Sequence, residues 1–350
     1  FMRSFTNRLA DKGWLTMAWP KEYGGGGATH TRQLVYNEEM SYAGAPTAVG
    51  SGISLAGPTV MVHGTEEQKR EFLPPIAHGE VVWCQLFSEP GSGSDLASLQ
   101  TRAVEDGDDF IVNGQKIWTS GAHHSDWAIL LARTDPDAPK HRGITYFLVD
   151  MKSPGVAVRP LVNMLGGHAF NEVFLENVRI PRRNVVGEEN RGWYVGATTL
   201  DFERSGIGRF AGGRRQLEEM TAYAKQARHN GGTLIDVPKV KLALADRTIE
   251  NNVGRWLAYR VGWMQSAGEI PNYEASMVKL YGSELQQRTA ATAMAMLGLS
   301  GQILEGSAQA PLDGRIPAGY MAAVANTIAA GTSEIQRNII ATRGLGLPRG

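Results

Sequence analysis

The chain has 350 residues, 42% hydrophobic and 20% charged, which is ordinary usage for a globular protein with room for two or three domains. Lys plus Arg and Asp plus Glu number 35 each, so the formal net charge is zero; neither a basic nucleic-acid-binding stripe nor an acidic tail is present. A single cysteine, Cys84, excludes an intramolecular disulfide and favours a reducing, cytoplasmic location. No apolar run reaches the roughly 18 residues of a membrane span, so no membrane partner is expected. The chain begins at Phe1 inside a predicted helix, and we expect its true N-terminus to be missing.

Residues 1–80 are predicted to form a helical domain. One helix occupies the start of the chain, a second runs from about Thr31 to Tyr42, and shorter ones follow. Thr65 and Gln68 have the spacing of a capping box, in which the N-cap and N3 side chains each hydrogen-bond the backbone at the other position. This pattern predicts a helix that begins at Thr65.

Residues 81–190 contain short runs rich in Val, Ile, Phe, Tyr and Trp, which are typical of strands. The runs are Val81–Leu86, Phe110–Val112, Lys116–Trp118, Trp127–Ala132, Ile144–Val149, Val156–Arg159 and Glu172–Phe174. Asn113-Gly114 between two of them is a strong signal for a two-residue hairpin turn. The regular spacing of the runs predicts a small antiparallel β-barrel or sandwich.

Residues 191–350 return to a helical period. Lys239–Ala267 and Tyr273–Leu297 are predicted to be long helices, separated by a Gly/Pro-containing break. The first has an apolar face formed by Leu242, Ile249, Val253 and Trp256. Long helices with breaks between them indicate an antiparallel bundle. The predicted fold class is therefore α+β multidomain: an N-terminal α-helical domain (1–80), an antiparallel β-barrel (81–190) and a C-terminal four-helix bundle (191–350).

The segment Phe87–Asp95, FSEPGSGSD, follows the first predicted strand. Its small residues, its proline and its hydroxyls cannot form a core element, and they present backbone N–H groups at a turning surface. Such groups suit a phosphate or a planar heterocycle. Taken alone, the segment fits an ordinary Gly/Ser loop better.

A second polar segment, Trp118-Thr119-Ser120, follows another predicted strand. A tryptophan in this position is more often part of a barrel core than a stacking platform. Together with Phe87-Ser88, however, two strand ends each supply an aromatic ring followed by hydroxyls. One flat ring could be stacked by the aromatic side chain and hydrogen-bonded by the hydroxyls.

Two other patterns point to no site. Residues 206–211, GIGRFA, match the G-x-G-x-x-G/A dinucleotide fingerprint, but charged helical residues precede them where that fingerprint needs a buried strand. We interpret these glycines as close helix packing. The eight histidines show no metal-ligand spacing, and the adjacent His123 and His124 would point apart on a strand, so no metal site is predicted.

Five motifs occur in an order that resembles the acyl-CoA dehydrogenase family, and they cover nearly the whole chain. They are WPKEYGG (19–25), SEPGSGSD (88–95), NGQKIWTS (113–120), EVFLENVRIP (172–181) and GTSEIQR (331–337). The resemblance implies an α domain, a β-barrel and a four-helix bundle, in agreement with the elements predicted above. It further implies bound FAD, an acyl-CoA substrate, α,β-desaturation, and transfer of electrons to an electron-transfer flavoprotein.

The resemblance also implies roles for residues of the β domain. Phe87 and Ser88 lie against the flavin ring in this interpretation. Trp118 covers the ring, and Ser120 hydrogen-bonds near its N5. Ser94 contacts the pantetheine or phosphate part of CoA.

The reaction needs a base that removes the weakly acidic α-proton of the thioester. Many members of the family carry a Glu immediately before the Gly-Thr of the last motif, where this chain has Ala330. A minority, including isovaleryl- and long-chain-type enzymes, place it on an earlier helix in a Leu-Asp-x-Glu-Arg context, and residues 200–204 here read LDFER. In isolation Asp201, Glu203 and Arg204 have the pattern of a solvated charged surface. With the resemblance, Glu203 is predicted to be the base, Ala330 to donate its backbone N–H to the thioester carbonyl, and Asp201 and Arg204 to lie at the substrate.

The chain departs from the family pattern at the cofactor. Thr332 and Glu334 are expected to line the FAD, although many relatives have Gln where Glu334 stands. The segment that usually reads Arg-x-Thr-Phe-Gly has Ala227 and Asn230 in place of the Arg and Phe, and Arg228 is the expected substitute. These departures resemble a bacterial subgroup that acts on bulky or branched acyl-CoAs, including steroid side chains, in homo- or heterotetramers. Two alternatives remain open: an FAD-poor partner subunit of a heteromeric complex, and an acyl-CoA oxidase or flavin monooxygenase of the same fold.

Overall fold

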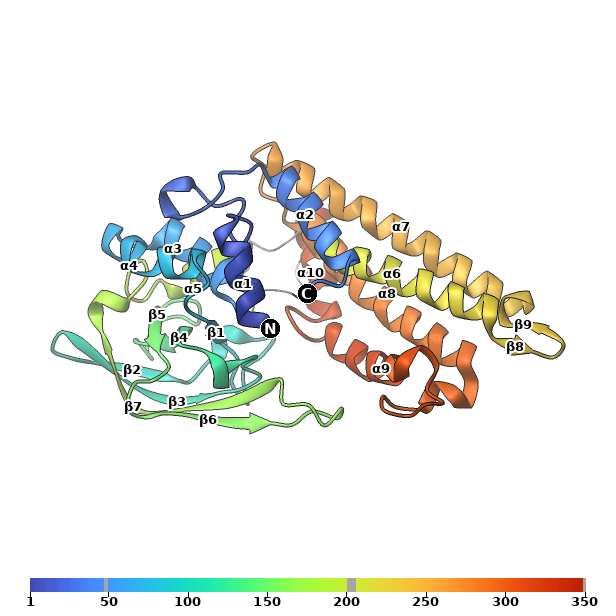
Figure 1. The fold of residues 1–350 in the computed structure, drawn as a ribbon. Helices are drawn as coiled ribbons and strands as arrows, with labels where there is room; N and C mark the ends of the chain where they lie inside the picture. The colour runs from blue at the N-terminus through green and yellow to red at the C-terminus, as the bar shows by residue number, and fades with distance from the viewer. Residues whose placement is uncertain (47–49, 200–205, 349–350) are drawn as a thin grey trace. The chain divides into compact units, whose positions relative to one another are not determined.

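A computed structural model describes residues 1–46, 50–199 and 206–348 (Figure 1). The chain divides into two compact units. Unit 1 combines Phe1–Ala28 with the described residues from Pro46 to Thr199, and unit 2 combines Thr29–Ala45 with those from Gly206 onward. The division into three domains at residues 80 and 190 stays a prediction.

Unit 1 consists of helices and a curled sheet (Figure 1). Its helices are α1 (Met2–Asp11), α3 (Gly57–His63), α4 (Glu66–Ala77) and α5 (Gly192–Thr199). The capping box predicted at the start of α4 is confirmed, because Thr65 Oγ1 accepts from Gln68 N at 3.2 Å and Gln68 Oε1 accepts from Thr65 N at 3.1 Å. Local sequence therefore determines where this helix begins.

The sheet of unit 1 has seven strands, ordered β1-β4-β2-β3-β7-β6 with β5 paired to β4. They are β1 (Trp83–Leu86), β2 (Arg102–Asp106), β3 (Asp109–Lys116), β4 (Trp127–Arg133), β5 (Ile144–Asp150), β6 (Val156–Leu161) and β7 (Phe170–Pro181). The sequence predicts antiparallel pairing throughout. The β2–β3, β3–β7, β4–β5 and β6–β7 pairs are antiparallel, but β1 and β2 both pair with β4 in parallel.

The strands β4 and β5 are buried on both faces. Ile129 and Leu148 pack toward the helices with Trp83, whereas Leu130 and Phe147 pack on the other face, inside the curl of the sheet. Alternate residues of a strand point to opposite faces, so two separate cores require two interleaved sets of apolar residues. This explains why these strands read as continuous apolar runs in the sequence.

The predicted hairpin at Asn113-Gly114 is wrong. Both residues lie within β3, where the register with β7 shifts between Val112 and Gly114. The hairpin that the sheet uses joins β2 to β3 around Gly107, which has a φ of 62°. Asn113 Oδ1 instead accepts from Asn177 N across the bulge at 2.9 Å. The shift spans two residues of β3, Val112 to Gly114, and three of β7, Val178 to Leu175, so the extra residue of this bulge lies on β7, where Asn177 has a φ of 53°.

The substitution Gly114→Ala is expected to destabilise unit 1 by about 1–3 kcal/mol. A Cβ at this position would lie 2.4 Å from Thr101 Oγ1 and 2.8 Å from Thr101 Cα, so backbone would have to move. Thermal unfolding measures the effect. Gly212→Ala in a helix of unit 2, where a Cβ meets nothing within 4 Å, is the control and should not lower stability. Equal melting temperatures for Gly114→Ala and the wild type would contradict the close contact between Gly114 and Thr101.

Unit 2 is a helix bundle (Figure 1). Its helices are α2 (His30–Tyr42), α6 (Ile207–Gln226), α7 (Pro238–Ser266), α8 (Tyr273–Leu297), α9 (Arg315–Asn326) and α10 (Ser333–Ile339), and the short strands β8 (Arg228–His229) and β9 (Gly232–Thr233) join α6 to α7. Helices α6 to α9 share a core in which Met220, Leu244, Ala293 and Ile316 are buried. Four helices meet there, as the sequence predicts. None of the described helices has the length and apolarity needed to cross a membrane.

Helix α2 packs against α6 and α7 although it precedes them by more than a hundred residues. The buried Glu38 carboxylate accepts from Arg255 Nε and from the Tyr259 hydroxyl of α7. Burial raises the pKa of Glu38, but the two hydrogen bonds and the charge of Arg255 outweigh it and hold that pKa below its usual value. A satisfied buried carboxylate thus joins a helix of the N-terminal segment to the bundle.

The apolar face predicted on α7 is solvent-exposed within the chain. Leu242 is 65% exposed, Ile249 62%, Val253 45%, Trp256 66% and, one heptad further, Trp263 63%. The buried face of α7 instead carries small residues such as Gly254, where a Cβ would lie 2.0 Å from Phe210 Cε1. Close helix packing inside the bundle uses these small residues, and the large ones are left on the outer face. We refer to Leu242, Ile249, Val253, Trp256 and Trp263 as the outer stripe of α7.

Candidate active site

The Phe87–Asp95 segment leaves the sheet at the end of β1 and forms a tight turn. Glu89 N donates to Ser92 O at 2.8 Å, and Ser92 N donates to Glu89 O at 3.0 Å. Ser92 Oγ is buried and donates to Asp95 O at 2.9 Å. The turn is therefore held by its own residues and leaves Ser94 exposed at its tip.

Within this segment, Phe87 and Ser88 are positioned by the sheet. The Phe87 ring is buried and lies edge-on to Tyr146, with ring centroids 6.0 Å apart. Ser88 is half-buried, and its carbonyl accepts from Ile117 N at 2.9 Å. This bond brings the end of β1 directly beside the end of β3, where the second predicted segment begins.

The Trp118–Ser120 segment turns sharply out of β3. Trp118 has a φ of 60°, is 59% exposed, and lies edge-on to Phe170 at 6.1 Å between ring centroids. Thr119 is buried, and its backbone N–H and carbonyl both bond Asn171, at 3.0 and 2.9 Å. Ser120 is exposed. A left-handed conformation at a bulky residue is strained and persists only where the surroundings enforce it, which is common at binding sites.

The expectation that His123 and His124 point apart on a strand is wrong. They lie in a short 3-10 helix, Ala122–His124, with ring centroids 4.0 Å apart, and the His123 ring also stacks on His168 at 4.0 Å. The side-chain amide of Asn171 bridges His123 and His168: it contacts His123 Nδ1 at 3.1 Å and His168 Nε2 at 2.7 Å. Burial and then the neighbouring imidazoles lower the pKa of His123. In the described ranges, no group of three His, Cys, Asp or Glu side chains has the geometry to hold a metal ion.

In unit 2, the last motif forms the loop that precedes α10. Ala330 and Gly331 have positive φ values of 54° and 85°. Thr332 caps α10 by accepting from Ile335 N at 3.2 Å, and Glu334 is exposed in the first turn. Hydrogen bonds from its own backbone N–H and from the Thr332 hydroxyl lower the pKa of Glu334. Among the hydrogen bonds between described residues, none has the Ala330 N–H as donor.

Two side chains contact the backbone carbonyl groups of this loop. Gln336 Nε2 lies 3.2 Å from Ala330 O and 3.3 Å from Gly331 O. Lys279 Nζ of α8 donates to Gly331 O at 2.6 Å. Burial and then Arg209 lower the pKa of Lys279 to about 8. The left-handed conformation of the loop is therefore fixed by contacts to two helices.

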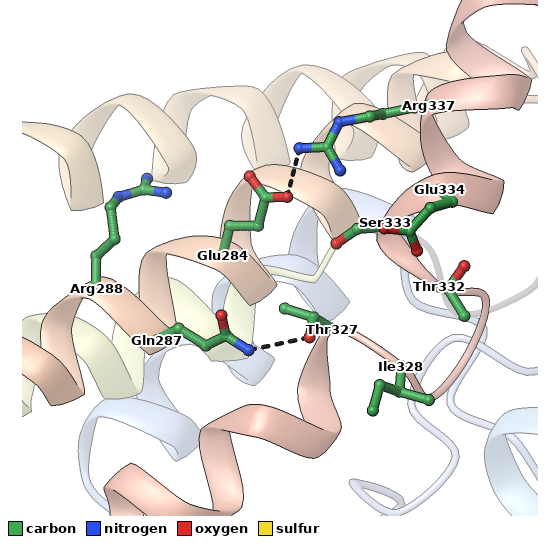
Figure 2. Close-up of a pocket in the computed structure, with 9 residues that line it drawn as sticks. All are labelled: Glu284, Gln287, Arg288, Thr327, Ile328, Thr332, Ser333, Glu334 and Arg337. Atoms are coloured by element: carbon green, nitrogen blue, oxygen red, sulfur yellow. Dashed lines mark hydrogen bonds and ion pairs between the residues drawn. The ribbon is translucent and has the colours of Figure 1, made fainter.

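A cavity of about 450 Å³ lies beside this loop (Figure 2). It is lined by Glu284, Gln287, Arg288, Thr327, Ile328, Thr332, Ser333, Glu334 and Arg337. An ion pair of 2.6 Å joins Arg337 to Glu284, and Gln287 Nε2 donates to Thr327 Oγ1 at 3.0 Å. Ser333 Oγ is buried and has no hydrogen-bond partner among the described residues. A buried hydroxyl without a partner beside a polar cavity is typical of a ligand site.

Among the described residues that line this cavity, Arg228 is not included. Arg228 lies exposed in β8, in the connection between α6 and α7. Asp201, Glu203 and Arg204 lie outside the described residues. Their predicted roles stay predictions.

Sequence reasoning missed Lys116, the residue that connects the two predicted segments of unit 1. Lys116 is completely buried and contacts both the Phe87 carbonyl and the Glu89 carboxylate. The signal was present, because the alternation of inward Phe110 and Val112 along β3 continues to position 116. A lysine at an inward position requires a buried partner.

Three family models match the chain in succession: "Acyl-CoA dehydrogenase, N-terminal domain" at residues 1–80, "middle domain" at 84–178 and "C-terminal domain" at 190–345. The acyl-CoA dehydrogenase FadE26 of Mycobacterium tuberculosis is 39% identical over 98% of this chain and 87% of its own length. FadE34 of the same organism is 40% identical over 97% of this chain, which spans only 46% of FadE34.

Solved structures agree with these matches. The "Tcur3481-Tcur3483 steroid ACAD" is 38% identical, with a TM-score of 0.92 over 100% of this chain and 89% of that one. The ChsE4-ChsE5 complex from Mycobacterium tuberculosis is 38% identical, with a TM-score of 0.91 over 100% and 90% of the two chains.

Proposed function

Since the chain belongs to the acyl-CoA dehydrogenase family of FAD-dependent oxidoreductases, we propose that it oxidises a specific acyl-CoA to the trans-2-enoyl-CoA and passes the electrons to an electron-transfer flavoprotein. The observation that carries the proposal is the direct pairing of two segments far apart in sequence. Ile117 N donates to Ser88 O at 2.9 Å, so Phe87–Ser88 and Trp118–Ser120 lie side by side, as binding of one planar ring by both segments would require.

Each unit, taken by itself, has groups of the kinds that contact a flavin. In unit 1, Trp118 offers an exposed ring, and the buried Thr119 Oγ1 has no hydrogen-bond partner among the described residues. In unit 2, Thr332, Ser333 and Glu334 line the 450 Å³ cavity with oxygen atoms. We propose that Phe87, Ser88, Trp118 and Ser120 hold the ring, and that Arg228, Thr332 and Glu334 hold the rest of the cofactor. Bound FAD would supply the acceptor for the hydride that leaves the β-carbon of the substrate.

The chain itself would supply the acid–base chemistry. Glu203 takes the α-proton of the thioester, so that the C–H electron pair becomes the new double bond while the β-carbon loses its hydride. The Ala330 N–H donates to the thioester carbonyl and stabilises the charge that develops there. Ser94 binds the CoA portion, and Asp201 and Arg204 lie at the substrate.

Anaerobic addition of the correct acyl-CoA is expected to bleach the flavin absorbance of the purified protein. Straight-chain, branched, aromatic and steroid side-chain CoA thioesters are screened in parallel, with free CoA as the control. Similarity to a structure named as a steroid ACAD favours the steroid side-chain thioesters. A flavin-loaded protein that no thioester bleaches would contradict the proposal. Reoxidation of the reduced protein by electron-transfer flavoprotein, but slowly by oxygen, separates a dehydrogenase from an oxidase or monooxygenase.

A second candidate function is an FAD-poor partner subunit of a heteromeric enzyme. Ala227 and Asn230 stand where a cofactor-binding Arg and Phe are expected, and one structural neighbour is a complex of two proteins. The flavin-to-protein ratio of the purified chain decides between the two. One flavin per chain supports the catalytic function, and a ratio near zero that rises only with a partner protein supports the second.

A further inference from the structure

The lysine at the end of β3 has a hydrogen-bond acceptor for each of its three N–H donors. Lys116 is 0% exposed, and its Nζ lies 2.9 Å from Glu89 Oε1, 3.1 Å from Phe87 O and 2.8 Å from Leu131 O. An ammonium group has three donors, and three acceptors surround this one. A buried charge is tolerated only where such matching is achieved.

Its partner, Glu89, is matched as well. Glu89 is 7% exposed, and besides Lys116 its carboxylate has two backbone N–H donors. Gln100 N donates to Oε2 at 2.6 Å, and Thr101 N donates to Oε1 at 2.8 Å. The pair therefore ties five pieces of chain together: the end of β1, the following turn, the segment that leads into β2, the end of β3 and the strand β4 through Leu131. All of them lie within unit 1.

We propose that Lys116 and Glu89 are positioning residues that set Phe87–Ser88 relative to Trp118–Ser120, and thereby determine the affinity and the environment of the flavin ring. The proposal rests on the flavin-dependent function proposed above. Lys116 bonds the carbonyl of Phe87 and is separated from Trp118 by one residue, so it touches the base of both segments. Neither Lys116 nor Glu89 is proposed to contact the substrate.

The charge of the pair matters in addition to its hydrogen bonds. Burial raises the pKa of Glu89, but Lys116 and the surrounding hydrogen bonds outweigh this and lower it. Burial lowers the pKa of Lys116 to about 8, although Glu89 acts in the opposite direction. Among the described residues, Arg133 of β4 also interacts with the charge of Glu89. At neutral pH both members are ionised, and removing one leaves the other buried and unpaired.

The test compares Lys116→Met, Glu89→Gln and the double variant with the wild type, by titrating the flavin-free proteins with FAD and recording the visible spectrum of the bound flavin. Lys116→Met is expected to weaken FAD binding at least about tenfold and to shift the flavin bands. Glu89→Gln keeps an acceptor and should lose less. The double variant should bind better than Lys116→Met alone, because no uncompensated charge remains.

Val112→Ala is the matched control for stability alone. Val112 is also buried in β3, but it belongs to the apolar core inside the sheet and contacts neither segment through hydrogen bonds. It should lower the melting temperature while leaving FAD affinity and spectrum unchanged. If Val112→Ala weakens FAD binding as much as Lys116→Met does at a similar melting temperature, the role is structural and the proposal is overturned.

A pH profile provides a readout that a structural role would not move. Above about pH 8 the wild-type ammonium becomes an amine with two donors for three acceptors, so the flavin spectrum should change near that pH. Lys116→Met should show no such change, and in Glu89→Gln the change should occur at lower pH. Because the folded state releases this proton at a lower pH than the unfolded chain does, deprotonation of Lys116 makes the free energy of unfolding rise with pH between about 8 and 10.5, so this titration does not itself unfold the protein.

These outcomes separate the proposed flavin-dependent function from the proposed positioning role of Lys116 and Glu89. A wild-type protein that binds no FAD refutes the proposed function and this inference with it. A wild-type protein that binds FAD and is bleached by an acyl-CoA, with a Lys116→Met variant of equal affinity, equal spectrum and equal pH profile, refutes this inference alone. If Lys116→Met does not fold, the affinity and pH profile of Glu89→Gln decide the question.

Discussion

The substitution Glu203→Gln is expected to lower the rate of flavin reduction by the acyl-CoA substrate about 10²- to 10⁴-fold while FAD remains bound. Gln has nearly the same shape as Glu but cannot accept the α-proton. Anaerobic stopped-flow measurement of flavin bleaching gives the rate, and the absorbance of the bound flavin before mixing verifies that the cofactor is retained. Glu305→Gln is the matched control, because it makes the same substitution at an exposed carboxylate to which no role is assigned.

A second variant tests where the base can stand. In the Glu203→Gln background, Ala330→Glu places a carboxylate at the position that many relatives use, and the backbone there already has a φ of 54° with a non-glycine residue. Partial recovery of bleaching is expected. Wild-type bleaching rates for Glu203→Gln would remove Glu203 from the mechanism. The double variant is therefore compared with Glu203→Gln, and a bleaching rate above that of the single variant counts as recovery.

Charge on the outer stripe of α7 is expected to reduce the oligomeric state of the protein. Leu242, Ile249, Trp256 and Trp263 are spaced by seven residues each, with Val253 between them, and all are exposed within the chain. A heptad spacing of large apolar residues fits another long helix running alongside. We infer that a second copy, or a partner subunit of the same fold, covers this stripe. The variant Trp256→Glu/Trp263→Glu should place two charges in that interface and dissociate it.

Size-exclusion chromatography with light scattering measures the result at several concentrations. Lys241→Glu is the control, since Lys241 is exposed on α7 but lies off the stripe. It should leave the mass unchanged. An unchanged mass for the double Trp variant, with its helical content retained, would show that the stripe is not the interface, and a wild-type monomer at all concentrations would contradict the assembly itself.

Local features of this fold follow from short stretches of sequence. The capping box at Thr65 and Gln68 begins α4, and α8 spans Tyr273–Leu297 as its helical period predicts. Both depend on contacts within a few residues, so a single chain segment contains the needed information. The order of helical, β and helical segments is predictable for the same reason.

Features that depend on a partner strand or helix were predicted less well. Asn113-Gly114 lies inside β3 opposite a bulge of β7, because β3 continues along β7 to Lys116. The strand β2 was missed: it is polar on its exposed face, and only pairing with β3 defines it. The apolar pattern of α7 predicts its exposed face, and the small residues on its other side are the ones that pack in the bundle. A pattern of apolar residues shows that a surface is to be covered but does not show by which partner.

By itself the sequence determined the family, the order of elements and the two segments, Phe87–Asp95 and Trp118–Ser120, at which a flavin is expected. Only the tertiary structure showed that Ser88 and Ile117 bond directly and that Lys116 is buried against Glu89. Sequence motifs are contiguous, so they identify residues by type and spacing. A buried ion pair depends on desolvation by the packing of several strands, which no contiguous stretch contains.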